Sequence, residues 1–280
     1  MNQDMDRRDF LVKSSTFLFG SFLGLSGVSN LIASEVEEKD CFSQPAIALI
    51  IDDIGFSSFH ARQFLELDVP ITFSILPRLR NSYDLALEIN DEGHEIMLHQ
   101  PMEPSDPSID PGPGALYVGY GAEKIADIME RNIGGLPYAI GVNNHMGSKF
   151  TQCQKEVKDF IAFIKKTGHF FIDSVTTRRS IAYKTAKNLD VNTACRNIFL
   201  DNNREETAIL YQLSRIKTIA RTHGCAIGIG HPFPETARAI RRFLESPEFL
   251  DFSFVHISKL ICFTNTKKPL STNRRGILML

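Results

Sequence analysis

The chain has no tryptophan, few cysteines and no excess of charge of either sign. Its five cysteines form no C-x-x-C pair and no zinc-finger spacing, which favours core thiols over a zinc finger or a disulfide framework. The formal net charge of −2 supplies no basic field, and no RNA-binding signature is present, so we expect no nucleic-acid partner. No internal repeat is evident, so we expect no repeat architecture.

What the chain does contain is enough apolar mass for a large core, since 43% of its 280 residues are hydrophobic and 23% are charged. A chain of this length holds one large domain or two small ones. No shift in composition marks an internal boundary after residue 46. We therefore expect one domain over residues 46–262, preceded by a charged linker at 35–45 and followed by a flexible polar tail at 263–280.

Residues 1–34 resemble an export signal of the twin-arginine type. The pattern Arg-Arg-x-Phe-Leu with a nearby lysine lies within residues 6–13, and a weakly apolar stretch diluted by serine and glycine follows. That stretch would just span a bilayer, so an uncleaved anchor that associates the protein with a membrane is the alternative. The segment predicts a periplasmic or exported protein.

From Ala46 onward, short apolar runs alternate with helical patterns. The runs that predict strands are residues 46–51, 71–76, 95–98, 139–142, 170–172, 191–200, 225–230 and 254–257. Apolar residues recur at helical spacing in residues 83–91, 122–132, 154–166, 205–223 and 237–244. Residues 101–114 are too rich in proline and glycine for a helix or a central strand and predict a long loop. The seven or eight βα units are typical of one parallel α/β domain, either a barrel or a doubly wound sheet.

The first strand organises the rest of the chain. The run from Ala46 to Ile51 is apolar on both faces, as in a buried strand of a parallel sheet, and it ends in Asp52, Asp53 and, two residues later, Gly55. Two adjacent carboxylates repel each other and are costly to desolvate, which predicts a cation or a proton beside them. The alternative is that both aspartates cap the following helix.

Polar side chains also follow five later strands. They are His99, Asn144 with His145, Asp173 with Ser174, Asp201, and His231. If the strands are parallel, these side chains converge with Asp52 and Asp53 on one rim of the sheet. Helix capping favours serine, threonine, aspartate and asparagine and does not account for three histidines.

Aspartate and histidine together form the ligand set of a hydrolytic divalent metal. Zinc is the most natural match, and manganese or nickel would also fit. One carboxylate of the Asp52–Asp53 pair would bind the cation and the other would act as a base. In a closed barrel the strand before His231 returns beside the first strand, so His231 could offer a proton to a leaving group.

Several motifs stand at these strand ends. They are Ile51-Asp-Asp-Ile-Gly55, Gly93-His-Glu-Ile-Met-Leu-His99, which continues to Pro104, Asn143-Asn-His-Met-Gly-Ser148, Phe199-Leu-Asp-Asn202 and Gly230-His-Pro-Phe-Pro234. Together, in order and spacing, they resemble the divergent subgroup of the polysaccharide deacetylase superfamily. The resemblance covers nearly all of residues 46–262 and implies a single distorted (β/α) barrel of about seven units.

The resemblance also implies roles for individual residues. Asp52 corresponds to the general base, Asp53 to the metal-binding carboxylate, His99 to the first metal-binding histidine and His231 to the general acid. The family's second metal-binding histidine is replaced here by Glu103.

The family's usual third motif is replaced by Asn143-Asn144-His145, which makes His145 the preferred third metal ligand beside Glu103 as a further candidate. Asn144, Asp173 and Asp201 are expected to contact substrate or to orient the ligating histidines. For Asp173 and Asp201, helix capping is the alternative.

The function implied is that of a zinc-dependent hydrolase that removes N-acetyl or O-acetyl groups from an envelope polysaccharide or a peptidoglycan-type glycan. The altered motifs favour one alternative, a catalytically impaired envelope scaffold that keeps the barrel to bind a glycan or a protein. A lesser alternative is a metal-dependent hydrolase of another amide or ester.

Overall fold

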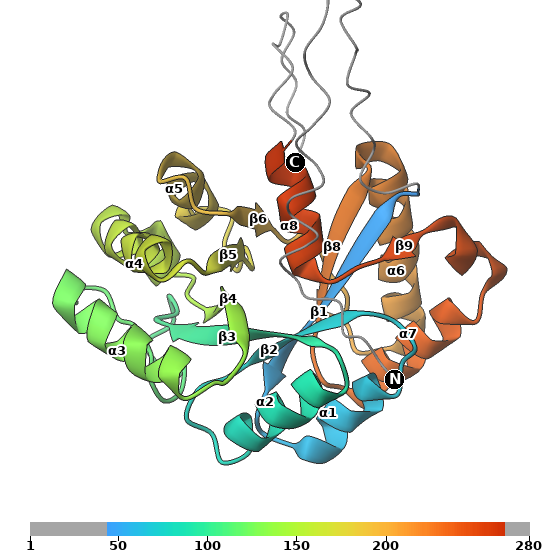
Figure 1. The fold of residues 1–280 in the computed structure, drawn as a ribbon, viewed down its shortest axis with the longest axis horizontal. Coiled ribbons are helices and arrows are strands. Elements are labelled where there is room, and N and C mark those ends of the chain that lie inside the picture. Colours follow the sequence, from blue (N-terminus) through green and yellow to red (C-terminus); the bar gives the residue numbers. More distant parts are fainter. Residues whose placement is uncertain (1–43, 267–280) are drawn as a thin grey trace, which may run out of the picture. The chain divides into compact units, whose positions relative to one another are not determined.

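Short apolar strands assemble into one nine-stranded sheet in which every recorded pairing is parallel (Figure 1). The computed structural model describes residues 44–266. The strands are β1 (Ala46–Ile54), β2 (Ile71–Ile75), β3 (Glu95–Met102), β4 (Ala139–Met146), β5 (Phe170–Asp173), β6 (Thr193–Cys195), β7 (Ile198–Phe199), β8 (Cys225–Gly230) and β9 (Ser253–Phe254). Their spatial order is β6-β5-β4-β3-β2-β1-β8-β7, with β9 paired to the start of β1.

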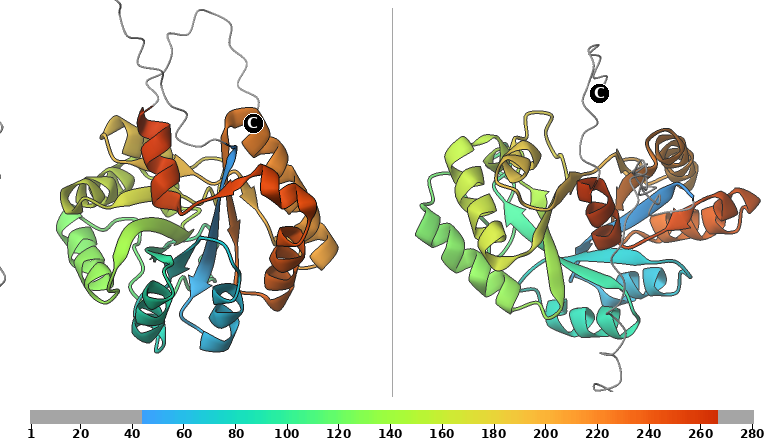
Figure 2. Two further views of the ribbon diagram at one scale, coloured as in Figure 1. Left: turned by 45° about the vertical axis from the view of Figure 1, so that its right-hand side comes forward. Right: turned by 45° about the horizontal axis from the view of Figure 1, so that its top comes forward.

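Helices alternate with the strands and surround the sheet (Figure 2). They are α1 (Ser58–Leu65), α2 (Ser82–Asp91), α3 (Ala122–Gly134), α4 (Gln154–Thr167), α5 (Ala182–Asn188), α6 (Glu206–His223), α7 (Pro234–Leu244) and α8 (Ile257–Thr266), with 3₁₀ turns at Phe150–Gln152 and Pro247–Asp251. No helix within residues 44–266 combines the length and apolar character that a bilayer crossing requires.

The sheet curls into an incomplete barrel. β6 and β7 form its two edges yet follow each other in sequence, so the chain itself crosses from one edge to the other. β8 lies directly beside β1, with Ala46 opposite Cys225 and Ile51 opposite Gly230. The expectation of a distorted (β/α) barrel is therefore confirmed.

Both faces of β1 are buried, but against different partners. Ile47, Leu49 and Ile51 point to the outer layer of helices, while Ala46, Ala48 and Ile50 belong to an inner cluster. That inner cluster includes four residues at the end of the chain's described part, Ile257, Leu260 and Ile261 of α8 and the preceding Val255. Helix α8 thus packs against the inner face of the curled sheet. Because β1 is covered on both faces, it needs apolar residues on both of its sides.

Several details differ from the predictions, among them helices α1 and α5, which lie outside the predicted helical segments. Residues 191–200 form two strands rather than one, because Asn197, which follows β6, bonds through its backbone and side chain to Ile227 of β8, near the opposite edge of the sheet. β3 runs through Pro101 to Met102. Since β2 has no partner residue past Leu98, the missing N–H of the proline breaks no ladder bond there.

A further difference is at the C-terminal end. Strand β9 is only Ser253–Phe254, so Phe254 is the one residue of the predicted strand 254–257 that it contains, and α8 begins at Ile257 and continues to Thr266, past the expected boundary at 262. Its first N–H groups are bonded by Thr72 and Glu95 of the sheet. The predicted signal at 1–34, most of the linker and tail residues 267–280 lie outside the described residues.

Candidate active site

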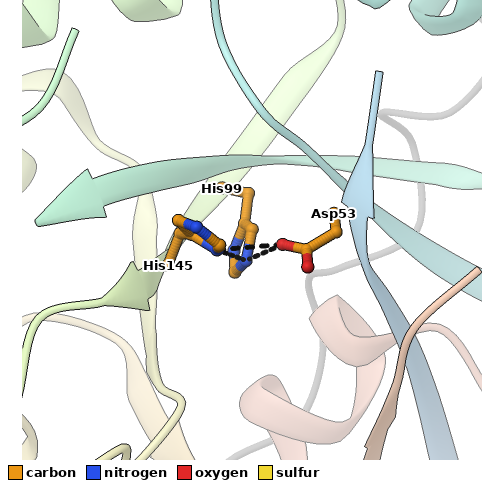
Figure 3. Close-up of side chains that lie close together, drawn as sticks. All are labelled: Asp53, His99 and His145. Carbon is orange, nitrogen blue, oxygen red and sulfur yellow. Dashed lines mark hydrogen bonds and ion pairs between the residues drawn. The ribbon is translucent and has the colours of Figure 1, made fainter. Parts of the chain in front are cut away.

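Asp53, His99 and His145 converge at the carboxyl ends of β1, β3 and β4 (Figure 3). Asp53 Oδ1 lies 2.9 Å from His145 Nδ1 and 3.1 Å from His99 Nε2. The two imidazole nitrogens are themselves 3.1 Å apart. Three of the four predicted metal ligands are therefore brought together by the fold.

A break in the regular strand allows both aspartates to approach the same histidine. Adjacent strand residues normally point to opposite faces of a sheet. The register of β1 shifts between Ile51 and Ile54, and Asp53 adopts a left-handed backbone with φ of 58°. As a result, Asp52 Oδ2 lies 3.7 Å from His99 Nε2 while Asp53 Oδ1 lies 3.1 Å from the same atom.

Asn143 contacts both His99 and Asp52, although it was not among the residues predicted for the site. Its Oδ1 accepts from His99 Nδ1 at 2.7 Å, and its Nδ2 donates to Asp52 Oδ1 at 2.8 Å. Because the amide oxygen only accepts, His99 carries a proton on Nδ1, and Nε2 is the nitrogen that faces Asp53. The alternation of β4 was the available signal, since Asn143 and His145 lie on the same face of the strand.

The donor set fits a divalent metal. The three candidate atoms lie within 4.8 Å of one another, and Asp53 Oδ1 is buried yet makes no hydrogen bond within the described part of the chain, despite the two nearby nitrogens. A buried carboxylate oxygen without a donor is costly unless a cation compensates it. One carboxylate and two imidazoles also form a ligand set typical of a catalytic zinc site with open positions.

The charges at the site are strongly coupled. Burial alone would raise the pKa of Asp53, but the imidazoles of His145 and His99 outweigh it and hold that pKa well below its usual range. Burial raises the pKa of Asp52, and His99 and His231 offset only part of that shift. A carboxylate with a raised pKa beside one with a lowered pKa is the arrangement expected for a base next to a ligand.

Glu103 is not brought to this cluster. Its carboxylate accepts from the backbone N–H of Val118 at 2.7 Å and pairs with Lys149 at 2.7 Å. These contacts hold the loop after β3 against the start of the 3₁₀ turn. The backbone N–H groups of Lys149 and Phe150 in that region also donate to the Glu103 carbonyl. In the structure Glu103 organises the rim and does not face the three ligand atoms.

His231 and Asp201 form a second charged pair, from the segments that directly follow β8 and β7. Asp201 Oδ1 lies 2.8 Å from His231 Nδ1, and Asp201 Oδ2 accepts from the His231 backbone N–H at 2.6 Å. Burial would lower the pKa of His231, but Asp201 outweighs it and raises the pKa to about 9. His231 is therefore protonated at neutral pH and can donate a proton. Asp201 was predicted to orient a ligating histidine, whereas in the structure it orients His231, the candidate proton donor.

Two aromatic rings also lie beside the His231 ring. Phe199 stacks on one side with ring centroids 5.9 Å apart, and the ring of Phe233 lies 5.7 Å away and is tilted. The guanidinium groups of Arg196 and Arg204 cover the rings of Phe199 and Phe233, at 3.6 Å and 3.7 Å from their centroids. These neighbours restrict the rotation of the imidazole.

The side chains of Asn144 and Asp173 bond to neighbouring segments at the rim of the sheet and not to the histidines. Asn144 Oδ1 accepts from the backbone N–H of Ser174 at 2.9 Å, which links β4 to the end of β5. Asp173 accepts from Ser180 Oγ at 2.6 Å and from the Tyr183 N–H at 3.2 Å, at the start of α5. The bond from the Tyr183 N–H agrees with the alternative prediction that Asp173 caps a helix, here α5.

All of the catalytic candidates line one hollow of about 340 Å³. Asp52, Asp53, His99, Asn144, His145 and His231 contribute to its wall. Ser148, Ser174 and Thr176 add hydroxyl groups, and Pro104, Ile109 and Phe199 add apolar surface. The hollow thus combines a metal-compatible triad, a buried carboxylate and a protonated histidine, which together are suited to hydrolysis of an acyl bond.

Comparison with known proteins identifies a family and several relatives of this chain. Residues 49–261 match the family described as divergent polysaccharide deacetylase. The uncharacterized protein YibQ of Escherichia coli K12 is 31% identical over 199 residues, which cover 71% of this chain but only 62% of that protein. An uncharacterized protein of Haemophilus influenzae is 31% identical over 223 residues, 79% of each chain. The crystal structure of an uncharacterized protein from Agrobacterium tumefaciens C58 superposes with a TM-score of 0.73 at 26% identity, covering 78% of this chain and 89% of that one.

Proposed function

This chain belongs to the divergent polysaccharide deacetylase family, and on that premise we propose that it is a metal-dependent hydrolase acting on acylated amines of an envelope polysaccharide. The observation that carries the proposal is the convergence of Asp53, His99 and His145 beside a buried Asp52 and a protonated His231. The twin-arginine pattern supports the further proposal that the protein works in the periplasm, with membrane attachment as the alternative.

Asp53 Oδ1, His99 Nε2 and His145 Nδ1 would hold the metal, for which we propose zinc. When bound, zinc would act as a Lewis acid on the acyl carbonyl of the substrate. Asn143 prepares His99 for this role because it fixes the proton on Nδ1 and leaves Nε2 facing the site.

The remaining steps belong to residues of the chain. Asp52 takes a proton from the attacking water, whose oxygen forms the new bond to the carbonyl carbon. His231 gives its proton to the amide nitrogen as the bond between that nitrogen and the carbonyl carbon breaks. The immediate products are a carboxylic acid, which then ionises in water, and a free amine, and exchange with solvent removes the proton from Asp52 and restores the one on His231. The hydrogen bond from Asn143 Nδ2 holds Asp52 in place for this transfer.

The principal alternative is a non-catalytic envelope scaffold that binds a glycan or a protein with the same barrel. The observation that favours it is the pairing of Glu103 with Lys149 at the position where the family has its second metal-binding histidine. A scaffold of this kind would bind its glycan or partner tightly even after Asp52 and His231 are replaced.

The proposal is tested by replacing the base without removing a ligand. Asp52→Asn keeps the size of the side chain and can still pair with Asn143, so we expect bound zinc to stay near one equivalent. Turnover of an N-acetylated oligosaccharide should fall by about 10²–10⁴-fold, the usual contribution of a general base.

The matched control is Asp91→Asn, an exposed aspartate at the end of α2, which should change neither metal content nor rate. Equal activity of Asp52→Asn and the unsubstituted chain would overturn the assignment of Asp52. Absence of turnover in the zinc-loaded chain, together with tight glycan binding, would favour the scaffold.

A further inference from the structure

A second hollow of about 280 Å³ opens beside the catalytic one. Three residues, Asp53, His145 and Met146, line both hollows. His231 and Phe199 line only the first hollow, whereas the wall of the second includes the loop after β2 and the proline-rich segment at 110–113. Anything bound at the metal-compatible triad therefore has access to two separate spaces.

The chemistry of the second hollow differs from that of the first. Its wall consists mainly of Phe56, Leu76, Leu79, four prolines and Met146. Beyond the triad, the charged group in its wall is Asp110, whose Oδ1 already accepts from the Gly112 N–H at 2.9 Å. A sugar ring would place its hydroxyl groups against surface that offers few hydrogen-bond partners, which is unfavourable.

The direction of the amide decides which part of the substrate meets this wall. The nitrogen of the scissile bond must lie toward His231, which belongs to the first hollow and donates the proton. The acyl carbon on the other side of the carbonyl then points away from His231, and the space on that side is the apolar hollow. At about 30 Å³ per water the hollow has room for about nine waters, far more than a methyl group occupies.

We propose that this hollow, bounded by Phe56, Leu79 and the 110–113 segment, is an acyl-chain site, and that the preferred substrate carries an N-acyl group longer than acetyl. The inference rests on the proposed function, since it uses the same triad and the same proton donor. Two positions with left-handed backbones, Asp53 with φ of 58° and Met146 with φ of 54°, form the boundary between the two hollows. Strained residues of this kind are held in place by their surroundings, as expected at a binding boundary.

Hydrolysis of glucosamine oligosaccharides carrying acetyl, butyryl or hexanoyl groups on nitrogen tests the proposal with the zinc-loaded full chain. Burial of one methylene group corresponds to about a fourfold gain, so kcat/KM should rise about sixteenfold from acetyl to butyryl, which adds two methylenes. Phe56→Ala should reduce the hexanoyl-to-acetyl ratio several-fold. Phe59→Ala is the matched control, because Phe59 is 70% exposed and Phe56 is 69% exposed, but Phe59 lies outside both hollows.

A binding measurement keeps the inference testable if no turnover is found. Calorimetric titration of the zinc-loaded chain with acetate, butyrate and hexanoate, the expected acyl products, should show affinity that rises with chain length and loses that rise in Phe56→Ala. Hydrolysis of the acetyl substrate without any gain for longer chains would overturn the acyl site and leave the proposed function intact. A Phe56-dependent gain with the number of sugars instead of acyl length would assign the hollow to a sugar.

If no substrate is hydrolysed but carboxylate affinity rises with chain length in a Phe56-dependent manner, the acyl site stands and the proposed hydrolysis fails. If affinity does not depend on chain length either, both fail.

Discussion

At the scale of single residues, Asn143 and Asp201 determine what the histidines can do. Asn143 accepts from His99 and donates to Asp52, so one side chain orients both a candidate ligand and the candidate base. Asp201 contacts the ring and the backbone of His231 and keeps that imidazole charged. Asn143 fixes the protonated nitrogen of His99, and Asp201 keeps His231 protonated. The proposed hydrolysis depends on both protonation states.

The pH dependence of activity should report the His231–Asp201 pair. The pKa of His231 is raised to about 9, so its proton is present below that pH and is lost as pH rises through it. We expect kcat/KM to fall above about pH 9. By the same sign, the stability contributed by the pair is fully present below the ordinary histidine pKa of about 6.5 and is lost as pH rises through about 9.

Asp201→Asn should move the alkaline limb down toward the ordinary histidine value, with a loss of about thirtyfold in kcat/KM at pH 8. The control is Asp127→Asn, which removes an exposed aspartate paired with Arg131 and should leave the profile unchanged. An alkaline limb that stays in place in Asp201→Asn would contradict the assignment of His231 as the proton donor.

At the scale of secondary structure, the site depends on how β4 packs between β3 and β5. β4 carries Asn143 and His145 on one face, and its pairing with β3 places His99 opposite Asn143. Two residues before Asn143 in β4, Gly141 lies opposite Phe170 of β5. A side chain built on Gly141 would lie 2.2–2.6 Å from atoms of the Phe170 ring, so the absence of a Cβ lets that ring enter the inner core.

Gly141→Ala should therefore destabilise the fold by about 1–3 kcal/mol through overpacking. The matched control is Gly134→Ala, near the end of α3, where an added Cβ meets no atom within 4 Å and should be neutral or slightly stabilising. Urea unfolding measures both, as a change in midpoint at constant slope. Equal midpoints for the two variants would show that the Phe170 ring relaxes without cost.

At the scale of the whole molecule, the three candidate ligands belong to β1, β3 and β4, so a bound metal links strands that are distant in sequence. A ligand that binds the folded state alone raises stability by mass action, about 2.7 kcal/mol at a hundredfold excess over Kd. For a domain of this size that corresponds to an increase in Tm of about 5–10 °C.

We expect zinc to produce such a rise in the full chain, accompanied by about one bound equivalent. Alanine at Asp53, His99 or His145 should abolish both the rise and the bound metal. Glu103→Ala is the decisive comparison, because the Glu103 carboxylate is bonded to Val118 and Lys149 instead of the triad, and it should keep the metal. Loss of zinc in that variant would show that Glu103 moves to the metal on binding.

Much of the architecture could be predicted from local patterns. The apolar run from Ala46 to Ile51, the glycine after α4 and the glycine after α6 report short-range physics, namely burial on both faces and left-handed helix ends at Gly168 and Gly224. The parallel order then places residues after each strand on one rim, which is why Asp53, His99 and His145 could be selected together.

Other features required the tertiary structure because they depend on contacts between distant residues. The start of α8 is capped by Thr72 and Glu95, the division of residues 191–200 follows from a bond between Asn197 and Ile227, and Glu103 is diverted by Lys149. No local pattern encodes these partners. The sequence alone thus determined a parallel α/β domain and the donor types at its rim, because strand burial and side-chain chemistry are local, while the choice of a barrel over a doubly wound sheet came from the family resemblance. Only the folded chain decided which donors meet, because their distances depend on register, the turn at Asp53 and the packing of neighbouring strands.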